Sequence, residues 1–348
     1  MSSENAGAKR PRNYGIDAFR LLSALPVIAS HGGQLERFDP MTRDLVSLLS
    51  KWSVPFFFLV LGYFLGKKNG KNRATPPMLR IAVMFALASL LMIPLDLIED
   101  GPAKTLQILS KMFLIYGTHF HLWFLSSLLM GLLVIRVTDE YEVKGLLRLC
   151  AITALLAAIL FCTYSPPAFA HLGRHLTSIP FLWFGILLSK RPLSLRQSIA
   201  LIVIGLAIQV AEVPVIHNVF GKVLSDCPLL IGTTPFALGV FGLASSLKNN
   251  PLIETLGRLG GRYTGCIYIT HVYFIWLLSC GAKYFGIEND REFYLLLVPI
   301  IFALNLSTLV LINRAAPRVI DVFLGDKAAI NSFGHAAGMA AHRVRASR

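Results

Sequence analysis

Charged residues are scarce in this chain. Asp, Glu, Lys and Arg make up 15% of its 348 residues, whereas soluble globular domains carry about 25%. Hydrophobic residues account for 55%, and the mean hydropathy is +0.62. This balance excludes an ordinary soluble domain and favours a chain that is largely surrounded by lipid.

Cysteine is also rare, and the patterns that bind metals or nucleotides are missing. The cysteines show no C-x-x-C and no Cys/His spacing typical of zinc, so we predict neither a disulfide framework nor a metal site. No convincing G-x-G-x-x-G, Walker loop, H-E-x-x-H or G-x-S-x-G occurs. The five cysteines are scattered, mostly within apolar runs, at Cys150, Cys162, Cys227, Cys266 and Cys280.

Long apolar runs are what the chain does contain. A membrane-spanning helix needs about 20 mostly apolar residues, and Asp17 and Arg20 interrupt the first run, so we do not expect a cleaved signal peptide. The pattern predicts an all-α, polytopic transmembrane helical bundle of about ten spans. They lie near 14–31, 44–66, 78–98, 119–137, 145–163, 176–190, 196–212, 223–246, 263–285 and 292–313.

Basic residues are distributed unevenly between alternate loops. If the N-terminus is cytoplasmic, 23 of the 33 Lys and Arg residues fall on the inner side and 9 on the outer side, as the positive-inside rule requires. We therefore predict cytoplasmic basic tails at 1–13 and 314–348, flanking one transmembrane domain at 14–313. This distribution explains the net charge of +14 without nucleic-acid binding.

The first span carries polar residues that lipid does not favour. Arg20 and His31 are separated by about three helical turns, so they share one face of a continuous helix, with Asp17 one turn before Arg20. Such residues normally face a protein interior or a watery cavity. One interpretation is a polar stripe along a cavity. The other is an Asp17–Arg20 pair at the membrane boundary, with His31 merely beginning a loop.

The spacing of Arg20 and His31 resembles the first-helix signature of the acyltransferase-3 family of membrane-bound sugar O-acyltransferases. Further segments resemble later helices of that family in the expected order, although Leu61 stands where a serine is common. They read WSVPFFFLVLGYFLGKK (52–68), HLWFLSSLLMGLL (121–133), FLWFGILLS (181–189) and CIYITHVYF (266–274).

The resemblance implies transfer of an acyl group from a cytoplasmic acyl-CoA to a sugar hydroxyl. The simplest donor is acetyl-CoA, and the acceptor would be an exopolysaccharide, a lipopolysaccharide or a related surface glycan. The protein would lie in the bacterial inner membrane and hold no permanently bound cofactor. The alternative is a transporter or flippase of a lipid-linked sugar, which would also place His and Arg within the membrane, but no repeated halves are visible.

The resemblance also suggests chemical roles for the first-span residues. His31 is the candidate base, because a histidine can take a hydroxyl proton near neutral pH. Direct transfer and an acyl-histidine relay both remain open. Arg20 would hold a CoA phosphate or orient the donor, and Asp17 would orient Arg20 or neutralise it.

Four more residues are candidates for substrate or donor binding. His121 is either a polar boundary residue or a second active-site imidazole, and Trp123 is either an interfacial anchor or a substrate platform. His271 lies inside a span, in a cavity or against a neighbouring helix. Arg80 either snorkels to the cytoplasmic surface or contacts CoA phosphate. His119 is expected in an outer loop, exposed to solvent.

Overall fold

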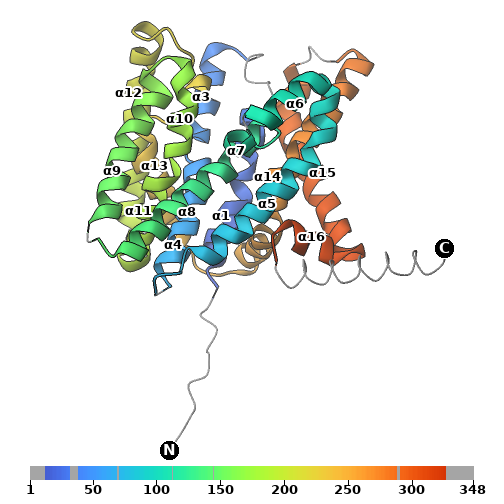
Figure 1. The fold of residues 1–348 in the computed structure, drawn as a ribbon. Helices are drawn as coiled ribbons and strands as arrows, with labels where there is room; N and C mark the ends of the chain where they lie inside the picture. The colour runs from blue at the N-terminus through green and yellow to red at the C-terminus, as the bar shows by residue number, and fades with distance from the viewer. Residues whose placement is uncertain are drawn as a thin grey trace, which may run out of the picture.

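The computed structural model describes residues 12–31, 38–68, 70–111, 113–143, 145–287 and 291–326, and every regular element in these ranges is helical (Figure 1). The prediction of an all-α fold is confirmed. The elements are α1 Tyr14–Leu22, α2 Ala24–His31, α3 Pro40–Ser50, α4 Ser53–Gly66, α5 Thr75–Glu99, α6 Gly101–Lys111, α7 Phe113–Tyr116, η2 Phe120–Leu122, α8 Trp123–Tyr141, α9 Leu146–Ile159, η3 Leu160–Tyr164, α10 Pro167–Leu176, α11 Ser178–Lys190, α12 Leu195–Asn218, η4 Leu224–Asp226, α13 Thr233–Ser246, α14 Pro251–Phe285, α15 Arg291–Ala315 and α16 Pro317–Phe323.

Seven helical stretches in the described chain are long and apolar enough to cross a membrane, which supports a multi-pass membrane protein. Three predicted spans coincide instead with shorter helices: the pair α1 and α2, the 13-residue α11 and the 14-residue α13. The number of ten spans therefore stays a prediction. The seven stretches are Pro40–Gly66, Thr75–Glu99, Phe120–Tyr141, Leu146–Tyr164, Leu195–Asn218, Pro251–Phe285 and Leu296–Ala315.

The first apolar run is not the continuous helix that the sequence analysis assumed. It is interrupted at Ser23, between α1 and α2. Pro26 has no backbone N–H, so the carbonyl of Leu22 loses its usual partner four residues ahead. The Ser23 hydroxyl hydrogen-bonds the Arg20 carbonyl at 2.7 Å. Ser23 keeps helical backbone angles, and its N–H still donates to the Phe19 carbonyl at 2.8 Å. The shared face of Arg20 and His31 therefore stays a prediction.

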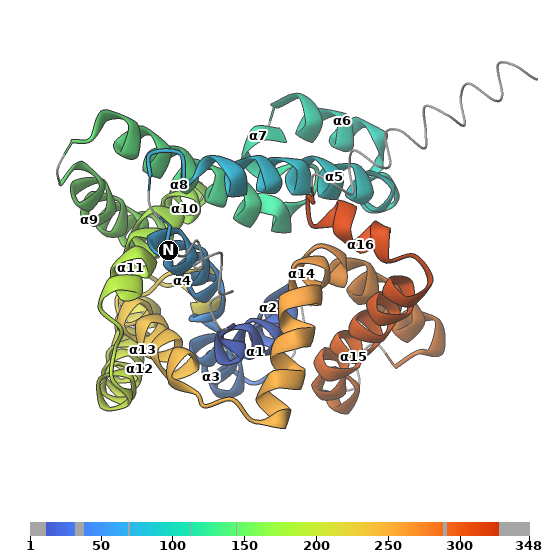
Figure 2. The ribbon, with the colours of Figure 1, turned by 90° about the horizontal axis from the view of Figure 1, so that it is seen from below.

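Helix α1 runs through the middle of the bundle, in contact with α4, α13 and α14 (Figure 2). Close helix approach depends on glycine, as is common between membrane helices. A Cβ on Gly62 of α4 would lie 2.2 Å from the Leu182 carbonyl, and one on Gly185 of α11 would lie 2.3 Å from the Leu59 carbonyl. These two helices therefore pack backbone against backbone.

The basic segments gather at one end of the bundle, the lower end in Figure 1, where α5 and α14 begin and α16 lies. Arg73 binds both carboxylate oxygens of Asp139 at 2.8 and 2.9 Å, which ties the segment before α5 to α8. Lys71 and Glu142 form an exposed pair there, and this hydrogen bond raises the pKa of Lys71 and lowers that of Glu142.

Part of the predicted C-terminal tail is folded. Helix α16 buries Ile320, and Asp321 pairs with Arg262 of α14. The sequence analysis predicted only a basic tail here, but Val319, Ile320 and Phe323 give this short helix an apolar side. Residues 1–11 and 327–348 lie outside the described chain.

Candidate functional site

Three of the predicted histidines meet at the upper end of the bundle, opposite the basic end. They are His31 at the end of α2, His121 in η2 and His271 in α14. The Nδ1 atom of His31 lies 2.8 Å from Nε2 of His271, and the two rings are stacked at 5.0 Å. The His121 ring lies 6.3 Å from that of His31 and 5.4 Å from that of His271. Residues far apart in the sequence thus form one cluster.

The hydrogen bonds within this cluster define the tautomers, which we assign from the network. The Nδ1 atom of His271 faces the carbonyl of Tyr268 at 2.7 Å, so it must carry a proton. In neutral His271, Nε2 then accepts a hydrogen bond from Nδ1–H of His31. The Nε2 atom of His31 is left with its lone pair. This is the protonation state that a general base requires.

Buried contacts position the segment that carries His121. Gly117 turns the chain with a positive φ of 70°, and a Cβ there would lie 2.7 Å from the Ser89 hydroxyl. Thr118 donates to the Ser89 carbonyl at 2.8 Å. Tyr268 lies on α14, one turn before His271. Its hydroxyl donates a hydrogen bond to the carbonyl of His121. The same helix therefore anchors two members of the cluster.

His119 is buried, so the expectation of a solvated loop residue was wrong. It is 6% exposed, and its Nδ1 lies 2.8 Å from Nδ1 of His121. Its Nε2 lies 3.9 Å from carboxylate oxygens of Asp96 and Glu99 at the end of α5. The segment around it folds back against α5, so a position just before a span did not place the side chain in solvent.

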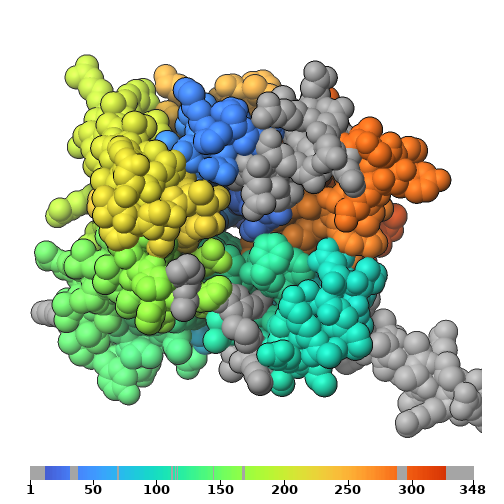
Figure 3. All heavy atoms as spheres, turned by 90° about the horizontal axis from the view of Figure 1, so that it is seen from above, coloured from blue at the N-terminus to red at the C-terminus, as the bar shows by residue number. Residues whose placement is uncertain are grey.

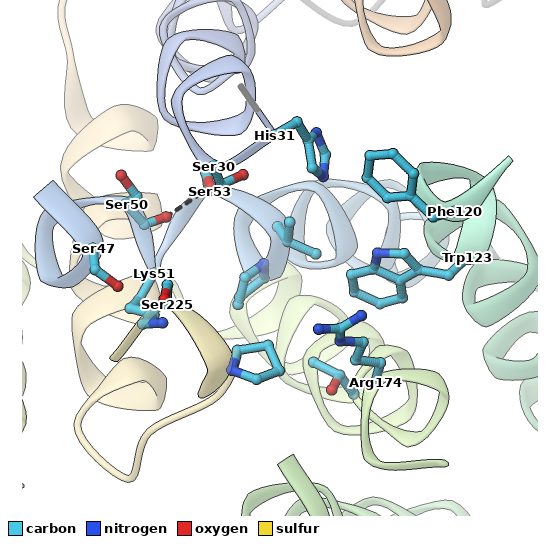
Figure 4. A pocket seen from close by; sticks show the side chains of 14 residues that line it. Ser30, His31, Ser47, Ser50, Lys51, Ser53, Phe120, Trp123, Arg174 and Ser225 are labelled. Carbon is cyan, nitrogen blue, oxygen red and sulfur yellow. Dashed lines mark hydrogen bonds between the residues drawn. The ribbon is translucent and has the colours of Figure 1, made fainter. Parts of the chain in front are cut away.

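A cavity of about 270 Å³ opens beside His31. Seen from above, the protein surface is hollowed near its centre, between the blue, yellow and teal segments (Figure 3). His31, Phe120, Trp123 and Arg174 border one side of the cavity (Figure 4). The opposite side carries Lys51 and the hydroxyls of Ser30, Ser47, Ser50, Ser53 and Ser225.

The serine side of the cavity presents hydrogen-bond acceptors. The hydroxyls of Ser30, Ser50 and Ser53 each donate to a backbone carbonyl of their own turn, at 2.6 to 2.8 Å. Each hydroxyl proton is therefore already donated to a carbonyl, and the oxygen lone pairs remain able to accept hydrogen bonds from a ligand. A wall of acceptors facing an aromatic wall suits a molecule with hydroxyl donors on its edge and an apolar face.

A second cavity of about 420 Å³ shares His31 and Phe120 with the first. Its other lining residues include His119, Glu99 and Trp276. His31 thus stands where two spaces meet, and a base at such a position can contact reactants that arrive from different sides.

The remaining predicted residues lie elsewhere. Asp17 is buried and pairs with Arg20 at 3.0 Å and with Arg12 at 2.7 Å. Within the described chain, neither Asp17 nor Arg20 contacts the histidines, so their catalytic roles stay predictions. Arg80 is exposed at the basic end and lines a cavity of about 460 Å³ together with Lys68.

Two cavity residues were missed by sequence reasoning. Lys51 and Arg174 were counted as outer-side charges, because the positive-inside rule uses position along the chain and ignores direction. A usable signal was present for Lys51, since this cation stands inside an otherwise apolar stretch from Leu45 to Leu65. For Arg174, the neighbouring histidines His171 and His175 were the only hint.

Among the described residues, no group of three or more His, Cys, Asp or Glu side chains is arranged to hold a metal ion. Hydrogen bonds instead join His31 to His271, His119 to His121, and His271 to the Tyr268 carbonyl. The absence of a metal in the reaction stays a prediction.

The comparison with known families supports one of the two functions that the sequence left open. Residues 13–314 match the family profile described as an acyltransferase domain, acyltransferase-3. The chain belongs to the acyltransferase-3 family. The match covers the whole predicted transmembrane domain, 14–313, and together with the apolar helices it supports a multi-pass membrane acyltransferase.

Curated relatives resemble part of this acyltransferase-3 chain. An amino-acid racemase of Enterococcus faecalis is 29% identical over 134 residues, which is 36% of this chain and 19% of the racemase. A serine/alanine racemase of Enterococcus gallinarum is 30% identical over 137 residues, again 36% and 19%. The chain thus matches about a fifth of the length of each racemase. No solved structure matches the chain.

Proposed function

We propose that this protein transfers an acyl group, most simply acetyl, from acyl-CoA to a sugar hydroxyl of an exopolysaccharide, a lipopolysaccharide or a related surface glycan. The observation that carries the proposal is the histidine pair, in which His271 leaves the Nε2 lone pair of His31 free at the edge of a cavity. The protein would act in a bacterial inner membrane, with both termini in the cytoplasm.

His31 would act as the general base. The O–H bond of the sugar breaks, and its proton moves to Nε2 of His31 while the oxygen attacks the thioester carbonyl carbon. The C–S bond then breaks, and its electron pair leaves on the CoA sulfur, which takes up a proton. An acyl-histidine relay through the same nitrogen is the alternative route. In both routes His271 would orient His31, in the way that a third group orients the histidine of a catalytic triad.

The cavity beside His31 would hold the acceptor sugar. Its volume of about 270 Å³ is near the lower limit of small-molecule sites, about 300 Å³, which favours a single sugar unit. Trp123 and Phe120 would contact the apolar face of the ring, and the serine oxygens would accept hydrogen bonds from its hydroxyls. We assign this cavity to the acceptor because it opens opposite the basic end, which would face the cytoplasm.

The donor would bind at the basic end. The cavity that Arg80 and Lys68 share also contains Asp326, Pro76 and Pro77. Two cations at the mouth of a cavity suit the phosphates of CoA, and the planar guanidinium of Arg80 is able to bind one of them with two hydrogen bonds. Arg20, held by Asp17, would stand along the path between this end and His31.

The phosphate contacts predict a specific effect on the donor. We expect Arg80→Gln combined with Lys68→Gln to raise KM for acetyl-CoA about tenfold, because charge-assisted hydrogen bonds to phosphate are lost. KM for acetyl-pantetheine, which lacks those phosphates, should change little. Steady-state kinetics of the purified variants measure both. Arg148→Gln, on an exposed site of α9 outside this cavity, is the control, and equal effects on the two donors would exclude phosphate binding here.

The activity itself is tested with a deletion strain and purified protein. We expect surface glycan from the deletion strain to lack the acyl group, and the intact gene to restore it. Radiolabel from [acetyl-¹⁴C]acetyl-CoA should pass to glycan in the presence of purified protein. If the glycan of the deletion strain is unchanged and no label moves to any sugar, the proposed function is wrong.

A further inference from the structure

Two cations border the cavity that contains His31. Lys51 lies in the turn between α3 and α4, and Arg174 lies on α10 (Figure 4). Among the described residues, no carboxylate forms an ion pair with either one; Asp226, which follows Ser225 in η4, is exposed. The cavity therefore has an excess of positive charge.

Lys51 is held in a fixed position. Its Nζ atom donates to the carbonyl of Leu224 at 2.7 Å and to that of Cys227 at 2.6 Å. An ammonium group has three N–H donors, so one remains for the cavity that Lys51 lines. Two carbonyls satisfy hydrogen bonds but supply no full negative charge. A cation in an apolar stretch without a carboxylate partner is costly, and in membrane proteins such residues mark substrate pathways.

Arg174 approaches the same space from the opposite wall. Its backbone carbonyl accepts a hydrogen bond from Ser127, but in the described chain its guanidinium forms no hydrogen bond or ion pair. Figure 4 shows this guanidinium at the cavity border, beside Trp123 and below His31. Its planar set of donors matches a carboxylate or a phosphate. The two cations thus offer complementary donors to one anionic group.

We propose that the acceptor is an anionic sugar, which carries a carboxylate or a phosphate close to the hydroxyl that is acylated. Lys51 and Arg174 hold the anion, and the hydroxyl is thereby directed to Nε2 of His31. This assignment rests on the proposed function, because it places the acceptor in this cavity. It goes further in that it selects acidic glycans over neutral ones.

The test compares matched acceptors. Purified full-length protein is given acetyl-CoA with methyl glucoside, methyl glucuronide or methyl glucoside 6-phosphate. We expect kcat/KM to be about 10- to 100-fold higher for a charged sugar, as charge-assisted hydrogen bonds imply, and to fall with added salt. The glucuronide and the phosphate distinguish the two sources of charge. Equal use of neutral and charged sugars would overturn the proposal.

Variants of Lys51 and Arg174 test whether these two cations cause the preference for charged sugars. Arg174→Gln and Lys51→Gln should each reduce the ratio of charged to neutral kcat/KM at least tenfold, and Gln at position 51 still offers donors to the two carbonyls. Lys222→Gln is the matched control, because Lys222 also donates to two backbone carbonyls, of Thr163 and Ser165, but does not line this cavity. An unchanged ratio in both cavity variants would refute the assignment.

A binding measurement separates this proposal from the proposed function. Thermal stabilisation of the purified protein by glucuronate, glucose 6-phosphate and glucose requires no acyl transfer. Stabilisation by a charged sugar in the wild type, and its loss in Arg174→Gln, would support the anion site even if no sugar were acylated. Equal stabilisation by all three would exclude the anion site even if acyl transfer were demonstrated.

Discussion

His31→Ala is expected to leave the protein folded and inserted but unable to acylate its acceptor. Loss of a positioned general base typically reduces the rate by about 10² to 10⁴-fold. The side chain lies at the edge of a cavity, and its ring hydrogen bond is with His271, so its removal should cost little stability. His31→Gln keeps much of the size and hydrogen bonding but lacks basicity, and it should be equally inactive. The measurement is glycan acylation in a complemented deletion strain.

Matched expression is essential for this test. His217→Gln is a suitable control, because His217 is a partly buried histidine whose Nε2 lies 3.3 Å from a carboxylate oxygen of Asp44, and it does not line the cavity. It should retain wild-type acylation at equal protein levels. Full acylation by either His31 variant would show that His31 is a boundary residue, and His121 or His271 would then have to supply the base.

The sequence singled out three histidines of the candidate site but did not show that they meet. His31, His121 and His271 were selected from a resemblance and from their unusual positions in apolar helices. Their convergence depends on packing between α2, η2 and α14, whose residues are up to 240 positions apart. Helical spacing placed His31 on the same face as Arg20, about three turns away, and gave no sign of its contact with His271.

The wrong expectation for His119 and the failure to select Lys51 and Arg174 have the same physical cause. The sequence pattern reports how apolar a segment is but not which way a turn folds. His119 was placed in solvent because it precedes a span, yet the turn at Gly117 folds it against Asp96. Lys51 and Arg174 were treated as topology signals, although tertiary structure directs both into a cavity. The all-helical fold, by contrast, follows from long apolar runs and is largely independent of such turns.

His271 is expected to act as a positioning residue. Its Nε2 atom accepts a hydrogen bond from Nδ1–H of His31. This hydrogen bond fixes the tautomer of His31 in which the lone pair lies on Nε2, the reactive nitrogen. His271→Leu removes the acceptor, so His31 is free to rotate or to move its proton to Nε2. We expect kcat to fall about 10²-fold, a substantial part of what a general base contributes, while KM for acetyl-CoA stays nearly unchanged.

A conservative variant distinguishes orientation from a packing effect. In His271→Gln, the amide oxygen of Gln is able to accept the same hydrogen bond from His31, whereas Leu, which is of similar size, has no acceptor. We therefore expect His271→Gln to recover at least a tenth of the wild-type kcat. If both variants fail equally while folded, the ring of His271 itself takes part in proton transfer. If His271→Leu retains full activity, the orienting hydrogen bond is dispensable, and the free lone pair of His31 must be maintained by the substrate instead.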